Sequence, residues 1–166
     1  MDILPSHHVW THVNKDWAIN SYHWQFMAQP YDFPERLLKG HEEYYIRRKL
    51  MKQGLGKGGF AEEEILEYIR CCTPENIHGV CEDYRACATI DFELDTADFE
   101  AGRKVECPTL VLWGERSHTN RHFTPRDAWP AYASNIVRFA CLPCGHYPSE
   151  QAPEETYAEL RGFFRS

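Results

Sequence analysis

Long apolar runs and a surplus of positive charge are both missing from this sequence. No apolar stretch approaches the ~20 residues of a membrane-spanning helix, and the first residues, Met1 to Ser6, lack the basic and then apolar segments of a signal peptide. The chain carries 18 lysines and arginines against 25 aspartates and glutamates, for a net charge of −7. Because nucleic acids and anionic membranes bind clustered positive charge, we expect neither as a partner. The expected location is the cytoplasm.

A disulfide framework and a disordered composition are also excluded. The seven cysteines are odd in number and scattered, and Cys71 and Cys72 are adjacent, whereas secreted disulfide frameworks are usually even-numbered. We therefore expect reduced thiols. Of the 166 residues, 43% are hydrophobic and 14% aromatic, which supplies enough apolar surface for a folded core.

Residues 7–102 have a helical pattern of apolar residues. Large side chains recur at steps of three and four from Trp10 to Ala28, which predicts one long helix ended by Pro30 and Pro34. Further helices are predicted over 42–53, 61–72, 74–88 and 91–100, with a glycine-rich connection over 54–59.

The helix predicted over 74–88 has a clear start. Thr73 is typical of an N-cap, and Pro74 is favoured at the first helical position. The apolar side of this helix carries Ile77 and either Val80 or Cys81. This side is expected to face the core.

After Gly102 the pattern becomes that of a parallel α/β structure. Residues 109–113 are a continuous apolar run, which predicts a strand buried on both faces, and 136–142 predict a second strand. Each strand is followed by a predicted helix, over 125–133 and 150–164. The last helix is expected to turn its large apolar side chains inward: Tyr157, Leu160, Phe163 and Phe164.

The predicted sheet is incomplete. Ile3 and Leu4 hint at a third strand, but parallel sheets are stable when several strands share a core that is covered on both faces. We therefore expect the chain to be the C-terminal part of a larger α/β protein.

A histidine follows the second predicted strand. His146 lies in the loop from Cys144 to Pro148, at the edge where open α/β sheets build their sites. Imidazole suits a general base because its ordinary pKa is near neutral pH. A loop histidine that is hydrogen-bonded to the backbone remains the alternative.

Several segments together resemble the α/β-hydrolase superfamily, most closely the haloacetate (fluoroacetate) dehalogenases, which are neighbours of the epoxide hydrolases. The resemblance is carried by Met1–Pro5, Tyr22–Trp24, Ala28–Pro30, Cys81–Ala86, Leu112–Gly114, Gly145–His146 and Glu150–Glu154. It covers only the C-terminal half of that fold. It implies that residues 1–6 end a core strand carrying the catalytic acid, that 7–102 form a helical cap domain, and that 103–166 form the last β-α-β-α part of the core.

The resemblance also implies roles for single residues. In that family an aspartate displaces the halide, and a water activated by a histidine and an acid hydrolyses the resulting ester. His146 matches the base and Asp2 the acid. The remaining rival for the acid is Glu115, and without the resemblance Asp2 would be interpreted as a solvated terminal residue.

Three aromatic side chains match the halide-binding residues of the family: His23, Trp24 and Tyr84. Imidazole, indole and phenol can each donate a hydrogen bond to a leaving halide. From its spacing alone, Trp24 would be interpreted as a packing residue.

The nucleophile of the family is absent from the sequence. No Gly-x-Ser/Asp-x-Gly motif occurs, and the nearest pattern, at 54–58, has glycine at its centre. We therefore expect a hydrolase fragment that is inactive alone, whose completed form acts on a halogenated short-chain acid without a cofactor.

Two other functions stay open. An epoxide hydrolase would use Tyr22 and Tyr84 to activate the epoxide oxygen. A non-enzymatic module would bind a partner, or a second copy as a homodimer, through an exposed sheet edge.

Pairs of potential metal or redox residues are given little weight. The pairs His8/His12 and His118/His122 have helical ligand spacing, but no third ligand is evident nearby, so no metal is expected. Cys141 and Cys144 have redox spacing, yet they do not open a helix that would stabilise a thiolate.

Overall fold

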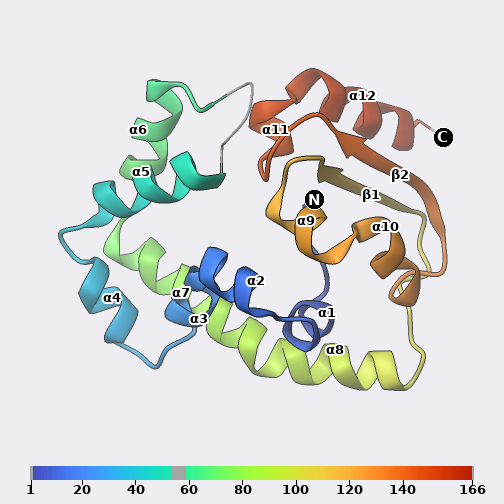
Figure 1. Ribbon diagram of the computed structural model, residues 1–166, viewed down its shortest axis with the longest axis horizontal. Coiled ribbons are helices and arrows are strands. Elements are labelled where there is room, and N and C mark those ends of the chain that lie inside the picture. Colours follow the sequence, from blue (N-terminus) through green and yellow to red (C-terminus); the bar gives the residue numbers. More distant parts are fainter. Residues whose placement is uncertain (1, 54–58, 166) are drawn as a thin grey trace.

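The computed structural model describes residues 2–53 and 59–165, in which a helical region precedes a small parallel sheet (Figure 1). The helical region comprises α1 (Ser6–Thr11), α2 (Lys15–Asn20), α3 (Tyr22–Met27), α4 (Phe33–Leu38), α5 (Glu42–Gln53), α6 (Glu62–Cys71), α7 (Pro74–Ala88) and α8 (Ile90–Glu100). The sheet region comprises β1 (Thr109–Gly114), α9 (His118–Phe123), α10 (Pro125–Ala128), the 3₁₀ helix η1 (Trp129–Ala131), β2 (Ile136–Leu142), α11 (Pro148–Gln151) and α12 (Pro153–Phe163). The glycine-rich connection predicted over 54–59 falls, apart from Gly59, outside the described residues.

The two strands confirm the predicted parallel sheet. β1 and β2 pair in parallel, with Leu112 opposite Ala140 and Gly114 opposite Leu142. The last four residues of β1 are buried, as expected of a strand covered on both faces. Both strands point their carboxyl ends at the same edge, where the loops that follow them meet.

The third strand suggested by Ile3 and Leu4 is not formed in the described part of the chain. Residues 2–5 have no regular secondary structure. Leu4 is instead buried in a hydrophobic cluster with side chains from α1, α2, α9 and α10. Tertiary packing, and not ladder hydrogen bonds, holds this segment in place.

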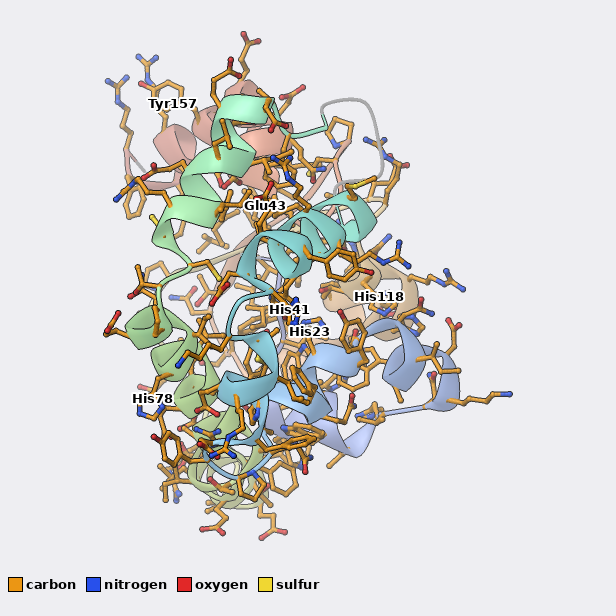
Figure 2. The ribbon with its side chains drawn as sticks, turned by 90° about the vertical axis from the view of Figure 1, so that its left-hand side faces the viewer. His23, His41, Glu43, His78, His118 and Tyr157 are labelled. Carbon is orange, nitrogen blue, oxygen red and sulfur yellow. The ribbon has the colours of Figure 1, made fainter. Side chains whose placement is uncertain are left out.

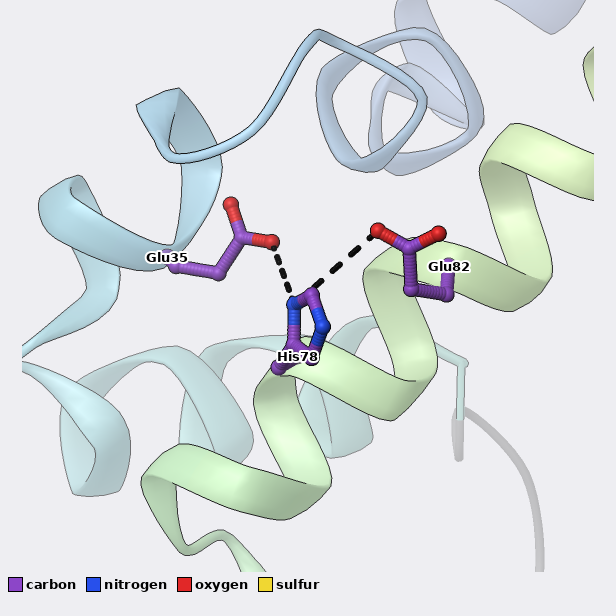
Figure 3. Close-up of side chains that lie close together, drawn as sticks. All are labelled: Glu35, His78 and Glu82. Atoms are coloured by element: carbon purple, nitrogen blue, oxygen red, sulfur yellow. Dashed lines mark hydrogen bonds and ion pairs between the residues drawn. The ribbon is translucent and has the colours of Figure 1, made fainter.

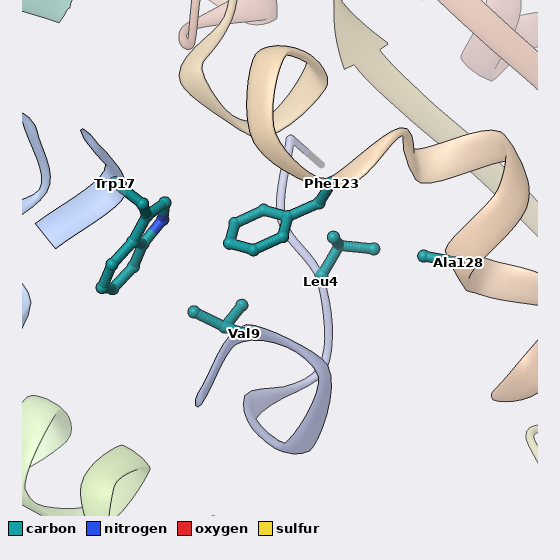
Figure 4. Close-up of a cluster of buried hydrophobic side chains, with 5 residues drawn as sticks. All are labelled: Leu4, Val9, Trp17, Phe123 and Ala128. Carbon is teal, nitrogen blue, oxygen red and sulfur yellow. The ribbon is translucent and has the colours of Figure 1, made fainter. Parts of the chain in front are cut away.

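That cluster joins the two regions of the molecule (Figure 4). It consists of the buried side chains of Leu4, Val9, Trp17, Phe123 and Ala128. Burial of each large apolar side chain contributes about 1.5–3 kcal/mol. Because Leu4 is part of the cluster, the preceding residues lie next to the sheet.

The prediction of a single helix from Trp10 to Ala28 is wrong, because the segment contributes to three short helices, α1, α2 and α3. The side chain of Asn14 accepts a hydrogen bond from the backbone N–H of Trp17 at 2.9 Å and caps α2. Such caps compete with helix continuation. The large side chains that recur along this segment nevertheless lie close together, since the ring centroids of Trp10 and Trp24 are 5.7 Å apart.

Prolines account for further differences at helix ends. Pro34 lies in the first turn of α4 and does not terminate a helix. The helix predicted over 125–133 ends at Ala128 and passes into η1, which contains Pro130. The helix predicted over 150–164 is broken before Pro153, which begins α12.

The inward face predicted for the last helix is wrong for Tyr157, Leu160 and Phe164, which are exposed, whereas Phe163 is half-buried. Tyr157 is 63% exposed and lies on the outside of α12 (Figure 2), and Phe164 is 78% exposed. Toward β2 the helix presents Glu159, which pairs with Arg138. Two strands offer too little sheet surface to cover a wide apolar helix face.

The start of α7 is as predicted. Thr73 caps the helix by accepting a hydrogen bond from the backbone N–H of Asn76. Ile77 and Cys81 are buried, whereas Val80 is exposed. Of the two alternatives for the buried side of this helix, the structure selects Cys81.

Within the described residues, the helices are too short or too polar to span a lipid bilayer.

Candidate functional site

Asp2 and His146 lie in direct contact although 144 residues separate them. Oδ2 of Asp2 is 2.7 Å from Nδ1 of His146, and the Asp2 side chain is 1% exposed. The loop after β2 carries the histidine, and the segment before α1 carries the aspartate. When Nδ1–H donates to the carboxylate, Nε2 is free to take up a proton. The pair can therefore work as a base with its orienting acid.

The second carboxylate oxygen of Asp2 is held by the loop after β1. Oγ of Ser117 donates a hydrogen bond to Oδ1 at 2.9 Å, and the backbone N–H of Gly114 lies 3.4 Å from the same oxygen. The Ser117 hydroxyl also accepts a hydrogen bond from the backbone N–H of Asn120 and so caps α9. One hydroxyl supplies one donor and two acceptor positions, so Ser117 satisfies both partners. The sequence does not predict a role for Ser117 in the site, because its N-cap pattern gives no sign of the contact with Asp2.

A glycine lets the two loops meet. A Cβ atom on Gly114 would lie 1.9 Å from the carbonyl oxygen of Gly145. Any larger residue at position 114 would push away the loop that carries His146. The end of β1 therefore approaches the His146 loop as closely as the backbone allows.

The rival acid lies elsewhere. Glu115 is exposed, and its described ion pair is a 4.0 Å contact with Arg116. The carboxylate that contacts His146 is that of Asp2.

His23, Trp24 and Tyr84 gather on the helical side of the same site. The ring of Tyr84, on α7, lies 5.7 Å from the rings of His23 and Trp24, both on α3. His23 is 7% exposed. Trp24 also packs against the rings of Trp10 and Trp17. Its contacts are therefore compatible with a packing role as well as with a role in the site.

One cavity connects the two halves of the site. Its volume is about 280 Å³, and its lining includes all five predicted site residues: Asp2, His23, Trp24, Tyr84 and His146. Figure 2 labels His23 and His118, and both residues line the cavity. Apolar walls with a few polar groups are typical of small-molecule sites.

Burial sets the protonation of the phenols in this cavity. It raises the pKa of Tyr84 to about 12 and raises that of Tyr147 further still. Both hydroxyls therefore keep their protons near neutral pH and can donate hydrogen bonds to an anion.

Lys49, on α5, also lines the cavity, which the sequence does not predict. Burial lowers the pKa of its ammonium group. It lies in the more polar helix over 42–53, where a lysine gives no signal of a site. Only the packing of α5 against the cavity reveals it.

Glu35, His78 and Glu82 form a second cluster of potential ligands, on α4 and α7 (Figure 3). Nδ1 of His78 lies 3.1 Å from Glu35 and 4.0 Å from Glu82. The guanidinium of Arg85 lies 2.9 Å from Glu35 and 2.6 Å from Glu82. Desolvation opposes ionisation of Glu35, but hydrogen bonds led by that of Arg85 lower its pKa to about 2. A cation is thus already present, and the cluster is an ion-pair network that ties α4 to α7.

The histidine and cysteine pairs noted in the sequence have ordinary structural contacts. The rings of His8 and His12 stack at 4.1 Å, and His122 faces Asp16 at 3.4 Å. Burial raises the pKa of the Cys144 thiol to about 11, which keeps it protonated and unreactive.

Two curated proteins similar to this chain are named as a dehalogenase and an epoxide hydrolase. It is 36% identical over 165 residues to a fluoroacetate dehalogenase from Burkholderia sp., covering 98% of this chain and 53% of that protein. It is 28% identical over 139 residues to a soluble epoxide hydrolase from Corynebacterium sp. (strain C12), covering 80% of this chain and 45% of that protein. The chain thus spans about half the length of the curated relatives it matches. No protein-family model matches it.

Solved structures agree with these relatives. A protein from Nostoc sp. PCC 7120 assigned to the α/β-hydrolases superimposes with a TM-score of 0.89 at 41% identity, over 98% of this chain and 55% of that one. A Pseudomonas aeruginosa protein assigned as an epoxide hydrolase gives 0.88 at 34% identity, over 99% and 55%.

Proposed function

Because this chain has the C-terminal part of the α/β-hydrolase fold and is related there to fluoroacetate dehalogenase and epoxide hydrolases, we propose that it supplies the base, the acid and the halide site of a haloacetate dehalogenase. The observation that carries the proposal is the single cavity lined by Asp2, His146 and the aromatic trio. In this scheme residues 7–102 form a cap over the site, and 103–166 with 1–6 belong to the core.

The proposed reaction divides its steps between this chain and a missing carboxylate. An aspartate outside this chain attacks the carbon that carries the halogen, a C–O bond forms, and the halide leaves with the C–X electron pair. His23, Trp24 and Tyr84 donate hydrogen bonds to the departing halide, where a dry and preorganised site makes each bond effective. The burial of His23 and the raised pKa of Tyr84 support this role.

The second step releases the product. Nε2 of His146 takes a proton from water, and the hydroxide adds to the ester carbonyl. The C–O bond to the enzyme carbonyl then breaks, and the imidazolium of His146 gives its proton to the departing alkoxide, so that a hydroxy acid, the free aspartate and the neutral base result. Asp2 stabilises the imidazolium across the 2.7 Å contact and fixes its orientation.

The sequence lacks the motif that would carry the nucleophile of the first step. Because no Gly-x-Ser/Asp-x-Gly motif occurs in its sequence, we propose that the chain alone does not turn over substrate. The hydroxy acid forms only when the chain works with a segment that holds a nucleophilic aspartate.

Co-expression tests this function. The chain is produced together with the N-terminal half of the Burkholderia fluoroacetate dehalogenase, and fluoride release from fluoroacetate is measured. We expect release from the pair and none from either half. The pair with His146→Gln is the control and should also release none in steady state. Release by the 166-residue chain alone, or a soluble complex of both halves without release, would contradict the proposal.

Epoxide opening is the second candidate, because one relative is a soluble epoxide hydrolase. Tyr84 lines the cavity, but Tyr22, its expected partner, is 41% exposed and absent from the lining. The assembled halves should therefore release fluoride faster than they open styrene oxide. The reverse order would favour the epoxide hydrolase.

A further inference from the structure

Two hydroxyl groups at the start of α9 hold Asp2, one by its side chain and one by its backbone. Oγ of Ser117 donates a hydrogen bond to the carboxylate oxygen Oδ1 at 2.9 Å, and Oγ1 of Thr119 donates to the backbone carbonyl of Asp2 at 3.1 Å. The first contact limits rotation of the carboxylate, and the second limits movement of the segment before α1. Together they fix both the position of the residue and the plane of its carboxylate.

The plane of this carboxylate matters because its other oxygen serves the base. Oδ2 of Asp2 is 2.7 Å from Nδ1 of His146. The Asp2 side chain is 1% exposed, so water cannot replace the Ser117 donor, and any segment that completes the fold can only bury Asp2 further. A carboxylate that lost this donor would turn toward another one, and the turn would move Oδ2 away from the imidazole.

The end of β1 sets the direction of the Ser117 hydroxyl through Asn120. The side-chain oxygen of Asn120 accepts a hydrogen bond from the indole N–H of Trp113 at 2.9 Å, and its amide donates to the carbonyl of Glu115 at 2.8 Å. The backbone N–H of Asn120 donates to Oγ of Ser117 at 3.0 Å, which leaves the hydroxyl proton for Asp2. A group supported by a strand in this way is held more precisely than one on a loop.

A second helix start shows that capping alone does not account for Ser117. Thr73 caps α7 by the same pattern, because its hydroxyl accepts a hydrogen bond from the backbone N–H of Asn76, three residues later, at 3.3 Å. Thr73 is half-buried, whereas Ser117 is 3% exposed and also donates to a carboxylate 115 residues away in sequence. The cap explains the hydrogen bond that Ser117 accepts, and it leaves the one that Ser117 donates to another role.

We propose that Ser117 and Thr119 are positioning residues, which hold Asp2 and, through it, the Nδ1–H form of His146 for hydrolysis of the ester. Ser117 lies outside the cavity lining, and Thr119 gives its hydroxyl proton to the Asp2 carbonyl, so both act through Asp2. The inference rests on the proposed function and deepens it, because it confines their effect to the second step. Formation of the ester uses the missing aspartate and the halide site, so it should not depend on them.

Nitrogen NMR of the isotope-labelled chain tests the positioning without turnover. The chemical shifts of the two imidazole nitrogens report which of them carries the proton in neutral His146, and their loss in His146→Gln assigns them. We expect the Nδ1–H form in the wild type and in Ser117→Thr, and a mixture of both forms in Ser117→Ala. Thr73→Ala loses a comparable helix cap and should keep the Nδ1–H form. An unchanged tautomer in Ser117→Ala overturns the inference.

Rapid quenching of the assembled enzyme, followed by mass spectrometry, measures the two steps separately. We expect Ser117→Ala to form the ester as fast as the wild type and to hydrolyse it about 10–100-fold more slowly, the scale seen when the orienting partner of a functional group is lost. Ser117→Thr should restore hydrolysis. Thr119→Val keeps the cap of α9 and should slow hydrolysis in the same way to a smaller extent, so it carries the test even if Ser117→Ala does not fold. Thr73→Ala should leave both steps unchanged.

Equal slowing of both steps in Ser117→Ala would show a purely structural role and overturn the inference, as would wild-type hydrolysis in Thr119→Val or an equal loss in Thr73→Ala. The two experiments separate this failure from failure of the function. Normal hydrolysis of the ester in Ser117→Ala rejects the role of Ser117 and keeps the dehalogenase. A tautomer that depends on Ser117, in an assembled enzyme that forms no ester, rejects the dehalogenase and keeps Ser117 as a positioning residue of the Asp2–His146 pair.

Discussion

The sheet region and the helical region build their shares of the cavity by different means. On the sheet side, directed hydrogen bonds converge on one buried carboxylate, from His146, Ser117 and Gly114. On the helical side, rings meet edge to face at 5–6 Å, as between Trp24 and Tyr84. Hydrogen bonds hold an atom within a few tenths of an ångström, whereas packed rings tolerate a wider range of distances and orientations.

This difference fits the chemistry proposed for each side. A base has to hold its nitrogen toward one water, so strands and tight loops position it. A halide site needs several donors around a small sphere, and packed helices can supply them with some tolerance. We therefore expect the largest losses of activity from substitutions on the sheet side. The largest losses of stability are expected from substitutions in the hydrophobic cluster that joins the two regions.

The largest effect is expected for Asp2→Asn in the assembled enzyme. The amide cannot stabilise the imidazolium of His146, so fluoride release should fall by about 10⁴-fold, the scale seen when a triad aspartate is replaced. Glu115→Gln changes the exposed rival acid, which does not contact His146, and should leave the rate nearly unchanged. Equal losses in both variants would remove the distinction between the two acids.

Trp17→Ala tests the packing that joins the two regions. Trp17 is 2% exposed and contacts the rings of Trp10, Trp24 and Phe123. Urea unfolding should show a loss of about 3–5 kcal/mol, the cost of replacing a large aromatic core side chain by alanine. Tyr157→Ala, on the exposed face of α12, should change the free energy of unfolding by less than about 0.5 kcal/mol. Similar costs for both would mean that the cluster does not hold the regions together.

Ser117→Ala removes a hydroxyl that serves the acid and the start of α9 together. The loss of one buried hydrogen bond and one helix cap should cost about 1–3 kcal/mol in unfolding free energy. Ser117→Thr keeps the hydroxyl and should recover most of it. Ser134→Ala removes an exposed hydroxyl and is the matched control. No difference between the two alanine variants would show that Asp2 does not depend on Ser117.

The smallest effect concerns acid stability on the helical side. Hydrogen bonds from Arg85 lower the pKa of Glu35 from its ordinary value of 4.5 to about 2, against an opposing contribution from desolvation. A pKa that is lower in the folded state gives stability that is complete above the ordinary value and is lost as the pH falls toward 2. Glu35→Gln should therefore be less stable than the wild type at neutral pH, with the difference shrinking during acidification. An exposed control, Glu63→Gln, should show no such convergence. A constant difference at all pH values would contradict the prediction.

The sequence could predict local structure where one signal dominated. The apolar run at 109–113 and the Thr73–Pro74 start of α7 gave correct elements, because burial and capping act locally. The long helix at 10–28 and the unbroken helix at 150–164 were wrong, since Asn14 and Pro153 interrupt patterns that span them. The spacing of apolar residues indicates that they are buried together, but it does not indicate whether one continuous helix carries them.

The candidate site shows a similar limit. The resemblance supplied the five residues that line one cavity, from Asp2 to His146. Ser117 and Lys49 could not be found in this way, because each looks ordinary in its segment, a helix cap and a lysine in a polar helix. Their significance depends on long-range packing, which places Ser117 115 residues away in sequence from the oxygen that it holds.

Trapping the reaction intermediate tests the central claim most directly. In the assembled enzyme with His146→Asn, the ester should form and persist, because no base activates the water that would hydrolyse it. Mass spectrometry after incubation with fluoroacetate should find the carboxymethyl ester on the aspartate of the supplied N-terminal half, with this chain unmodified. An adduct on a carboxylate of this chain, or fluoride release without any adduct, would contradict the assignment.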